Sequence, residues 1–331
     1  MDLTEHKDKV FATAQSYSRI DKESIPDGQN EIRLFVKARN ESLRLPYFLD
    51  YYYKRGVDRI FLIDNDSTDN TREIALSFKH THVFKIDESF ENYIYWMEYF
   101  LEIYGKDRWC VVVDVDELIF YPHAETIGLK QLIAYLDLYR YTAIRCLLLD
   151  MYSDIPIKDT FYSAGEDPLK TCPYFDSSYE LKQSSFLDKK QWINFESISY
   201  SGGMRKRVFG SIGQQQWDYC LSKIPLLKYS AGIYLTAGMH AVNGSNIADL
   251  QGVLFHTKFM SDFSKEVKNE AIRGVRWMHG AEYKIYNYHL HQTPAMVLKT
   301  DQSIRFTDSG QLTDLGLMTT SKNYEEYIHL K

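Results

Sequence analysis

The chain has 331 residues with 45 acidic and 39 basic side chains, which gives a formal net charge of −6. With this balance the protein has no positive electrostatic field over its whole surface. This excludes the function classes that depend on such a field to bind nucleic acid or an anionic membrane. No run of about 18 apolar residues occurs, and the N-terminus lacks the apolar segment of a signal peptide. We therefore expect a cytoplasmic protein, with peripheral contact at the inner face of a membrane still open.

The first 122 residues divide into a polar segment and a regular one. Residues 1–30 end in the turn signal Pro-Asp-Gly-Gln-Asn and are predicted to form an arm ahead of the main fold. Apolar patterns then predict strands at 33–38, 59–63, 82–86 and 109–113, alternating with helices at 43–55, 70–78 and 93–104. This alternation over residues 31–122 predicts the α/β class, with a buried, mainly parallel sheet and right-handed crossovers.

The second half of the chain, residues 123–260, is less regular. A helix is predicted at 127–139 and a strand at 142–149, with shorter strand-like pieces near Arg207, Leu235 and Val253. The stretch 152–188, rich in Pro, Asp and Ser, is interpreted as a functional insertion. A long amphipathic helix from 261 to about 289 is predicted to open the C-terminal extension, 261–331.

The four cysteines are Cys110, Cys146, Cys172 and Cys220. They lie far apart and include no Cys-x-x-Cys pair, which disfavours a zinc site or a disulfide framework. We interpret all four as reduced packing residues.

The strongest chemical signal is an apolar strand that delivers two carboxylates, in Trp-Cys-Val-Val-Val-Asp114-Val-Asp116-Glu117. Ligands bind α/β sheets at the carboxyl ends of strands, where both carboxylates are expected to lie. Hard divalent cations prefer oxygen ligands, so Asp114 and Asp116 together indicate a site for Mn²⁺ or Mg²⁺. The alternative, a capping or solvated role, is less consistent with the end of a central strand.

A second polar cluster follows the predicted strand 59–63. Asp64 and Asn65 have the hydrogen-bonding groups to recognise the edge of a pyrimidine base. The following Asp66-Ser67-Thr68-Asp69 is also a good helix cap, and both roles are expected together.

Two later segments contribute a histidine and several cations. His256 closes a short apolar strand and precedes Lys258 by two residues; it is either structural or a metal ligand, and Lys258 suits a phosphate. The segment from Gly202 to Gly210 holds Arg205 and Arg207, which suits either a mobile loop over a diphosphate or a solvated basic turn. His240 is a weaker candidate, for a core or a catalytic role.

These motifs together resemble glycosyltransferase family 2, in the branch with a DxDE-type motif and a late histidine. The matching segments, in family order, are Lys37-Ala38-Arg39-Asn40-Glu41, Ile63 to Thr71, Val113 to Glu117, and Leu254 to Phe259. The resemblance covers roughly residues 31–260. It implies a GT-A fold, with a Rossmann-like, mainly parallel central sheet flanked by helices, a smaller acceptor-side lobe and C-terminal helices.

The resemblance also implies ligands and residue roles. The donor would be a nucleoside diphosphate sugar, a UDP-sugar being favoured, bound by residues 31–122, and residues 123–260 would bind a glycan or glycolipid acceptor. Arg39, Asp64 and Asn65 would contact the nucleoside, Asp114 and Asp116 the metal and diphosphate, and His256 the metal. Lys37 and Asn40 join the nucleotide contacts from the same segment, and Arg205, Arg207 and Lys258 do so by their charge.

The chain departs from the family where the general base is expected. About ninety residues after the metal motif the family has an acidic dipeptide, but this region reads Arg-Lys-Arg-Val-Phe-Gly. Asp218, Asp150 and Asp154 are the candidate bases, and the sequence does not choose among them. If the family chemistry holds, a carboxylate deprotonates an acceptor hydroxyl that attacks the anomeric carbon with inversion.

Three other functions compete with this interpretation. A haloacid-dehalogenase-like phosphatase also ends an apolar strand in Asp-x-Asp, but its motif lies near the start of the domain. A nucleotidyltransferase is disfavoured because no glycine-rich basic loop follows the first predicted strand. A sugar-binding protein without turnover is the third, and the complete set of candidate metal ligands argues against it.

Overall fold

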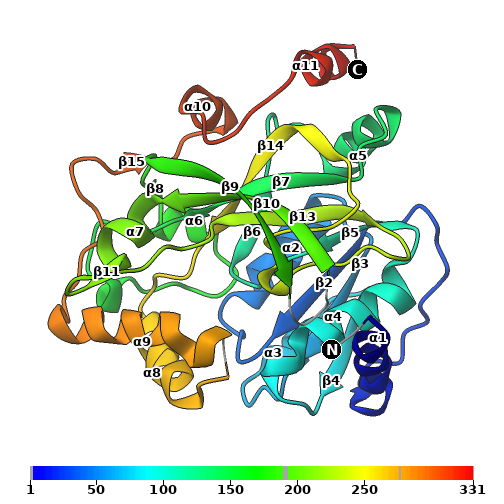
Figure 1. Cartoon of the computed structure of the whole chain (residues 1–331), viewed down its shortest axis with the longest axis horizontal. Coiled ribbons are helices and arrows are strands. Elements are labelled where there is room, and N and C mark those ends of the chain that lie inside the picture. Colours follow the sequence, from blue (N-terminus) through cyan, green and yellow to red (C-terminus); the bar gives the residue numbers. More distant parts are fainter. Residues whose placement is uncertain (1–2, 189–192, 276, 331) are drawn as a thin grey trace.

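The computed structural model describes residues 3–188, 193–275 and 277–330. In this part of the chain a central sheet has the strand order β1-β4-β3-β2-β5-β13-β7-β14-β6, and helices flank it (Figure 1). Its strands are β1 (Tyr17–Arg19), β2 (Arg33–Ala38), β3 (Arg59–Asp64), β4 (Thr81–Ile86), β5 (Arg108–Val112), β6 (Glu117–Phe120), β7 (Ala143–Asp150), β13 (Ser222–Tyr229) and β14 (Ile247–His256). The predicted α/β class is confirmed.

The four strands β4, β3, β2 and β5 are parallel to one another. Their residues alternate between two apolar clusters, one on each face, because successive side chains of a strand point to opposite sides. Leu34 and Val36 pack in one cluster, whereas Phe35 packs in the other and stacks on Phe61 with ring centroids 4.9 Å apart. Both faces are therefore buried, as the continuous apolar runs predicted.

Helices from the first half of the chain cover these two faces. They are α2 (Leu45–Lys54), α3 (Thr71–Ser77), α4 (Tyr93–Phe100) and α5 (Leu129–Leu138). The α2 residues Phe48 and Tyr52 pack in the cluster of Leu34, and the α4 residues Trp96 and Phe100 pack in that of Phe35. A π-helical turn, Leu101–Gly105, continues α4 towards β5.

The N-terminal segment lies against the sheet. Helix α1 (Leu3–Ala12) contacts α4, and a 3₁₀ turn, Thr13–Gln15, leads into β1, which pairs antiparallel with β4 at the sheet edge. His6, fully buried on α1, contacts Glu98 of α4 at 2.5 Å between Nε2 and Oε2. The predicted arm thus extends the main sheet by one short strand.

The second half of the sheet mixes strand directions. Strand β13 is antiparallel to both of its neighbours, β5 and β7, while β14 is parallel to β7 and antiparallel to β6. The strand expected near Val253 is β14. Near Leu235 there is only an isolated bridge to Val242, so no strand forms there.

The prediction of a strand or a mobile loop around Arg207 is wrong, because Gly203–Phe209 forms helix α7. Met204 and Phe209 on this helix are fully buried. The burial of these two side chains holds the backbone of α7 in place. The glycines and charges of this segment had suggested a mobile backbone.

The predicted insertion at 152–188 holds small elements and the start of a hairpin. The small elements are a 3₁₀ turn (Ile157–Asp159), α6 (Pro168–Thr171) and β8 (Tyr174–Phe175), which pairs with β15 (Ile304–Arg305). Strands β9 (Tyr179–Asp188) and β10 (Ile193–Gly202) pair antiparallel, and a smaller hairpin joins β11 (Ser211–Ile212) to β12 (Gln215–Gln216). A 3₁₀ turn, Ala237–Met239, precedes β14.

The single long helix predicted at 261–289 is two helices, α8 (Phe263–Arg273) and α9 (Trp277–Gln292). Gly274 ends α8 in the left-handed conformation, at φ +63°, which stops a helix. Helices α10 (Ser309–Asp314) and α11 (Lys322–His329) lie across the molecule from α8 and α9 (Figure 1). None of the helices described combines the length and apolarity needed to cross a membrane.

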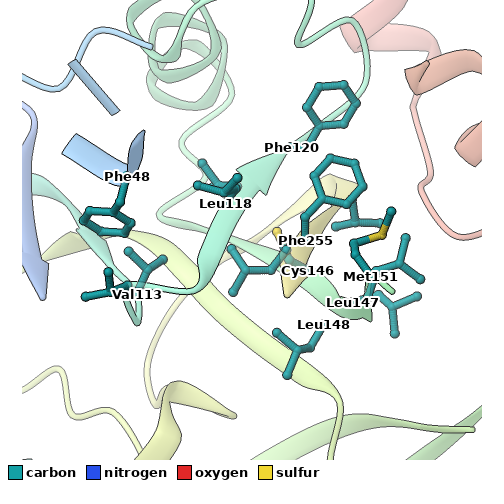
Figure 2. Packing of buried hydrophobic residues seen from close by; sticks show 14 of the residues in the cluster. Phe48, Val113, Leu118, Phe120, Cys146, Leu147, Leu148, Met151 and Phe255 are labelled. Atoms are coloured by element: carbon teal, nitrogen blue, oxygen red, sulfur yellow. The ribbon is translucent and has the colours of Figure 1, made fainter. Parts of the chain in front are cut away.

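The turn between β5 and β6 is held in place by apolar side chains that pack in the core. Figure 2 shows Phe48 beside Val113, with Leu118 and the ring pair Phe120 and Phe255 in the same cluster. Phe120 and Phe255 have ring centroids 5.1 Å apart. This packing fixes the backbone that carries Asp114 and Asp116.

Candidate active site

The candidate site lies where five strands end at one edge of the sheet. Because β13 runs opposite to both β5 and β7, strands β7 and β14 run in the same direction as β2, β3 and β5. Their last residues therefore share an edge, and Asp150 and His256 are direct partners in the register of β7 and β14. The edge at which ligands bind such sheets thus collects residues from both halves of the chain.

Asp114 lies within a network of lysines. Its carboxylate contacts Lys37 at the end of β2, and its Oδ2 is 3.8 Å from Nζ of Lys223 on β13. The buried Lys223 ammonium also lies 2.8 Å from Glu117, whose carboxylate accepts the backbone N–H of Asp114 at 3.0 Å. Although burial opposes ionisation, Lys37 and Lys223 lower the pKa of Asp114.

Asp116 lies against His256. The Nε2 atom of His256 is 3.2 Å from Oδ2 of Asp116, and its Nδ1 atom is 2.7 Å from Oδ1 of Asp150. Arg205 of α7 holds Asp150 through its Nε, which donates to Oδ2 at 3.0 Å. A row of four charged side chains, Asp116, His256, Asp150 and Arg205, therefore runs from the strand edge to α7.

The two carboxylates change the proton affinity of His256. Burial alone would lower the pKa of the imidazole, but Asp116 and Asp150 together raise it to about 9. Burial raises the pKa of each carboxyl, but His256 and Lys258 lower that of Asp116, and Arg205 and His256 lower that of Asp150. In the metal-free protein at neutral pH, His256 is an imidazolium between two carboxylates.

The donor set fits a divalent cation only in part. Within residues 3–188, 193–275 and 277–330, no three side chains of His, Cys, Asp or Glu are grouped as a metal site. Asp116 and His256 are close enough together to offer two ligands, while the carboxylate of Asp114 contacts lysines. Since Mg²⁺ sites often combine one or two protein ligands with substrate phosphates and water, these residues fit a cation bound together with a diphosphate.

Polar atoms without partners lie at the end of β3. Asp64 and Asn65 are buried, and in each the Oδ1 atom has no hydrogen-bond donor among the described residues. The remaining groups are engaged: Asp64 Oδ2 accepts from Ser67 N at 3.2 Å, and Asn65 Nδ2 donates to Glu88 O at 3.0 Å. An unpaired buried acceptor costs about 1–3 kcal/mol, so a ligand would gain about that amount for each of the two atoms to which it donates.

Neighbouring residues of the β2 segment hold this turn in place. The Nη1 atom of Arg39 donates to the carbonyl of Asn65 at 3.0 Å, and Oδ1 of Asn40 accepts from the backbone of Thr68 at 2.8 Å. Arg39 and Asn40, which were predicted to contact the nucleotide, thus support the turn that carries Asp64 and Asn65.

Lys258 has protein partners for its ammonium. Strand β14 ends at His256, and the Nζ of Lys258 donates to Tyr283 Oη at 2.8 Å and lies 3.5 Å from Glu266. Burial opposes the charge, but Glu266 and Tyr283 raise the pKa of Lys258. The amine is therefore charged but committed to α8 and α9.

The remaining predicted residues lie in other contacts. Arg207 pairs with Asp176, 2.7 Å from Nε to Oδ2, and Asp218 contacts Lys182 and Ser201. Asp154 accepts from the hydroxyl of Tyr174 at 3.4 Å. None of the contacts described joins these three residues to Asp114, Asp116 or His256. Of the three predicted bases, Asp150 alone belongs to the site, and both its oxygens are engaged.

Sequence analysis missed two cations of the site. Lys223 lies between Asp114 and Glu117. Arg44, near the start of α2, donates from Nε to the carbonyl of Thr257, next to His256, at 3.4 Å, and holds Asp262 with two hydrogen bonds of 2.6 and 2.9 Å. The strand Ser222–Tyr229 carries a lysine at each end of its apolar run, and Lys223 was a usable signal because a charge that becomes buried in such a strand needs a partner. Arg44 had no such signal.

Comparison with known proteins gives only a slight likeness. No protein-family model matches the chain, and no curated protein matches it. The chain is similar to a glucosyl-3-phosphoglycerate synthase from Mycobacterium tuberculosis, solved with Mn²⁺, UDP and glucosyl-3-phosphoglycerate, at 15% identity and a TM-score of 0.25 over 40% of this chain and 50% of that one. The structure of that synthase with Mg²⁺ and UDP gives 15% identity and a TM-score of 0.25, over 44% of this chain and 47% of that one.

A solved mycobacterial protein is similar at 14% identity and a TM-score of 0.25, over 44% of this chain and 45% of that one. The matched part spans about half the length of these proteins or less. Likenesses of this size carry no argument about function.

Proposed function

We propose that the chain is a metal-dependent glycosyltransferase of the GT-A type, which moves a sugar from a nucleoside diphosphate sugar to a hydroxyl of a glycan or glycolipid. The observation that carries this proposal is the arrangement at the carboxyl edge of the sheet. The unpaired oxygens of Asp64 and Asn65 lie at the end of β3, and the pair of Asp116 and His256 lies beyond β5. Lys37, on the intervening β2, lies between them.

The spacing and chemistry of these groups suit a nucleoside diphosphate. Strands β3 and β5 are two places apart in the sheet, which corresponds to about 10 Å. A pyrimidine base with a ring N–H, such as uracil, would supply the donor that Asp64 and Asn65 lack, which favours a UDP-sugar. Lys37 and Lys223 would then lie beside the diphosphate, where their charges offset its repulsion from Asp114.

Asp116 and His256 are the residues that would hold Mn²⁺ or Mg²⁺ together with the diphosphate. When bound, such a cation neutralises charge on the departing diphosphate. Asp150 would fix the orientation of His256 through Nδ1, a role common for carboxylates behind metal-binding histidines. Because both of its oxygens are engaged, we do not assign Asp150 as the general base. Inversion at the anomeric carbon is part of the proposal through the resemblance to family 2.

The decisive experiment measures apparent stability with a panel of nucleoside diphosphates, each with and without Mn²⁺. A ligand that binds only the native state raises its melting temperature, so UDP should stabilise the protein with Mn²⁺ and lose most of this effect with EDTA. Release of UDP from a UDP-sugar then tests turnover. Release of phosphate from a generic phosphoester would indicate a phosphatase instead, and UDP-sugar binding without UDP release a binding protein.

A further inference from the structure

The reaction proposed above leaves one chemical role unassigned. An acceptor hydroxyl attacks readily only when a base takes its proton, and this base must be ionised and within hydrogen-bond reach of the hydroxyl. The carboxylates of Asp116 and Asp150 both contact His256, and Asp150 also contacts Arg205. A further carboxylate with an unoccupied oxygen beside the site is therefore needed.

Arg205 brings such a carboxylate to the site. Its Nε donates to Asp150 at 3.0 Å, and its Nη2 lies 3.0 Å from Nδ1 of His256. The remaining nitrogen, Nη1, lies 3.5 Å from Oε1 of Glu282 on α9, the helix beside α7 (Figure 1). A single guanidinium group thus separates Glu282 from the histidine proposed to bind the metal.

The two oxygens of Glu282 differ in their contacts. Oε1 accepts a hydrogen bond from the hydroxyl of Tyr286, a fully buried residue that packs against Phe209 with ring centroids 4.8 Å apart. The side chain of Glu282 is 32% exposed, and Oε2 has no partner among the residues that the structure describes. One oxygen is therefore held in place while the other is open to a ligand.

We propose that Glu282 is the general base of the transfer, a role that rests on the function proposed above. Oε2 accepts the proton of the acceptor hydroxyl while the hydroxyl oxygen bonds to the anomeric carbon of the donor. The bond from that carbon to the diphosphate breaks, and its electron pair leaves with the diphosphate. Arg205 is a positioning residue, because its guanidinium holds both Glu282 and Asp150.

The charges around Glu282 agree with this role. Burial raises the pKa of its carboxyl, but Arg205 and Lys258 lower it below the usual value. At neutral pH the group is therefore a carboxylate that can accept a proton. The same two cations make the protonated form a stronger acid, so the proton passes on to water at the exposed side of the group.

Glu266 on α8 is the matched comparison. Its side chain is 33% exposed, and its Oε1 accepts from the hydroxyl of Tyr283 at 2.9 Å and lies 3.5 Å from Nζ of Lys258. The two glutamates therefore agree in exposure, in having a tyrosine donor and in their distance from a cation. They differ in that cation, because Arg205 contacts the proposed metal ligand directly whereas the Lys258 ammonium donates to Tyr283.

The test measures UDP release from UDP-glucose, UDP-galactose and UDP-N-acetylglucosamine with Mn²⁺. Water is the nucleophile in this assay, and the same base would deprotonate it. Glu282→Gln should bind UDP with Mn²⁺ as the wild type does in calorimetry, but its UDP release should fall at least about 100-fold, as expected for loss of a general base. Glu266→Gln should lose less than about tenfold, because it keeps that base.

Rescue by a small carboxylate separates catalysis from a structural role. Glu282→Ala leaves room for formate, which can accept the proton in place of the missing side chain. Formate should raise UDP release by this variant at least about tenfold, and it should not raise release by Glu266→Ala or by the wild type. A loss of activity caused by misfolding would not respond to formate.

Near-normal release by a folded Glu282→Gln protein, or equal losses in the two glutamine variants, would overturn this assignment and leave the glycosyltransferase proposal intact. A wild-type protein that releases no UDP from any of the three donors would overturn both. Glu282→Asp is the second variant if glutamine prevents folding. It keeps a carboxylate on a shorter side chain and should release UDP at least about tenfold more slowly than the wild type.

Discussion

The two ends of the candidate site differ in how their polar groups are satisfied. At the β3 end, one buried oxygen each of Asp64 and Asn65 has no donor among the residues that the structure describes, whereas at the other end the carboxylates of Asp114, Asp116 and Asp150 all contact cations. A ligand at the first end supplies a missing partner and displaces nothing. A ligand at the second end must exchange with a proton or an ammonium that is already there, so its binding depends on pH and on the cations that accompany it.

The largest effect, on turnover, is expected from a substitution of Asp116 at the end of the site where the carboxylates contact cations. Asp116→Asn removes one of two proposed metal ligands and should lower turnover by at least about three orders of magnitude, about 4 kcal/mol on the barrier. Steady-state UDP release at saturating Mn²⁺ measures it. The matched control is Asp154→Asn, an exposed carboxylate outside the site that should leave turnover unchanged. Near-normal turnover in a folded Asp116→Asn protein would exclude the proposed role.

A smaller effect, on stability, should follow loss of the buried lysine. Lys223→Met leaves Glu117 without its cation, and breaking a buried ion pair should cost about 3 kcal/mol in the free energy of unfolding. Lys228→Met, on the same strand, breaks a half-exposed pair with Asp137 and should cost less than about 1 kcal/mol. Urea unfolding of both variants gives the comparison. Equal losses would mean that burial does not distinguish these two pairs.

The β3 end of the site can be tested through the affinity for UDP. Asp64→Asn replaces a charged acceptor by a neutral one and should weaken UDP binding by about 1.5 to 2 kcal/mol, with little change in metal affinity. Isothermal calorimetry with UDP and Mn²⁺ measures the change. Asp66→Asn, in the same turn but exposed, is the control, since asparagine tolerates its left-handed backbone at φ +60°. Equal weakening by both variants would argue against a base contact at Asp64.

The smallest effect is the pH dependence of the charged end. Because metal binding needs neutral His256 and its pKa is raised to about 9, affinity for Mn²⁺ with UDP should rise about tenfold per pH unit, about 1.4 kcal/mol, up to that pH. His256→Gln should abolish this slope. In the metal-free protein the sign is opposite: a raised folded pKa stabilises the fold fully below pH 6.5, and this contribution is lost as pH rises through about 9. Melting temperatures with and without metal separate the two trends.

The sequence predicted those parts of the fold that depend on local patterns. Strands β2 to β5 are apolar runs separated by helices of ordinary length, so their class and direction followed from short-range signals. Asp114 and Asp116 were found because they end such a strand. His256 and Asp150 were each predicted as site residues, but their contact with one another was not. It depends on the register of β7 and β14, which pairs residues 106 positions apart.

What the sequence did not predict depends on distant contacts. Lys223 acquires its role from Glu117 and Asp114, and Arg44 from Asp262, 218 residues away. The glycines and cations of 202–210 suggested a loop, but burial of Met204 and Phe209 outweighed that local preference. The sequence likewise did not show that Lys37 and Lys223 both contact the carboxylate of Asp114, a predicted metal ligand.

The position of β13 has a consequence for synthesis of the chain. It joins β5 to β7, so the parallel half of the sheet has an unpaired edge at β5 until residues 222–229 are made, ~110 residues later. At ordinary rates of translation this delay is on the order of ten seconds. During that interval the nascent chain exposes the hydrogen-bonding groups of β5, which is apolar after Arg108 and is a template for pairing with another chain. The emerging polypeptide is thus a candidate client for ribosome-associated chaperones until its middle strand arrives.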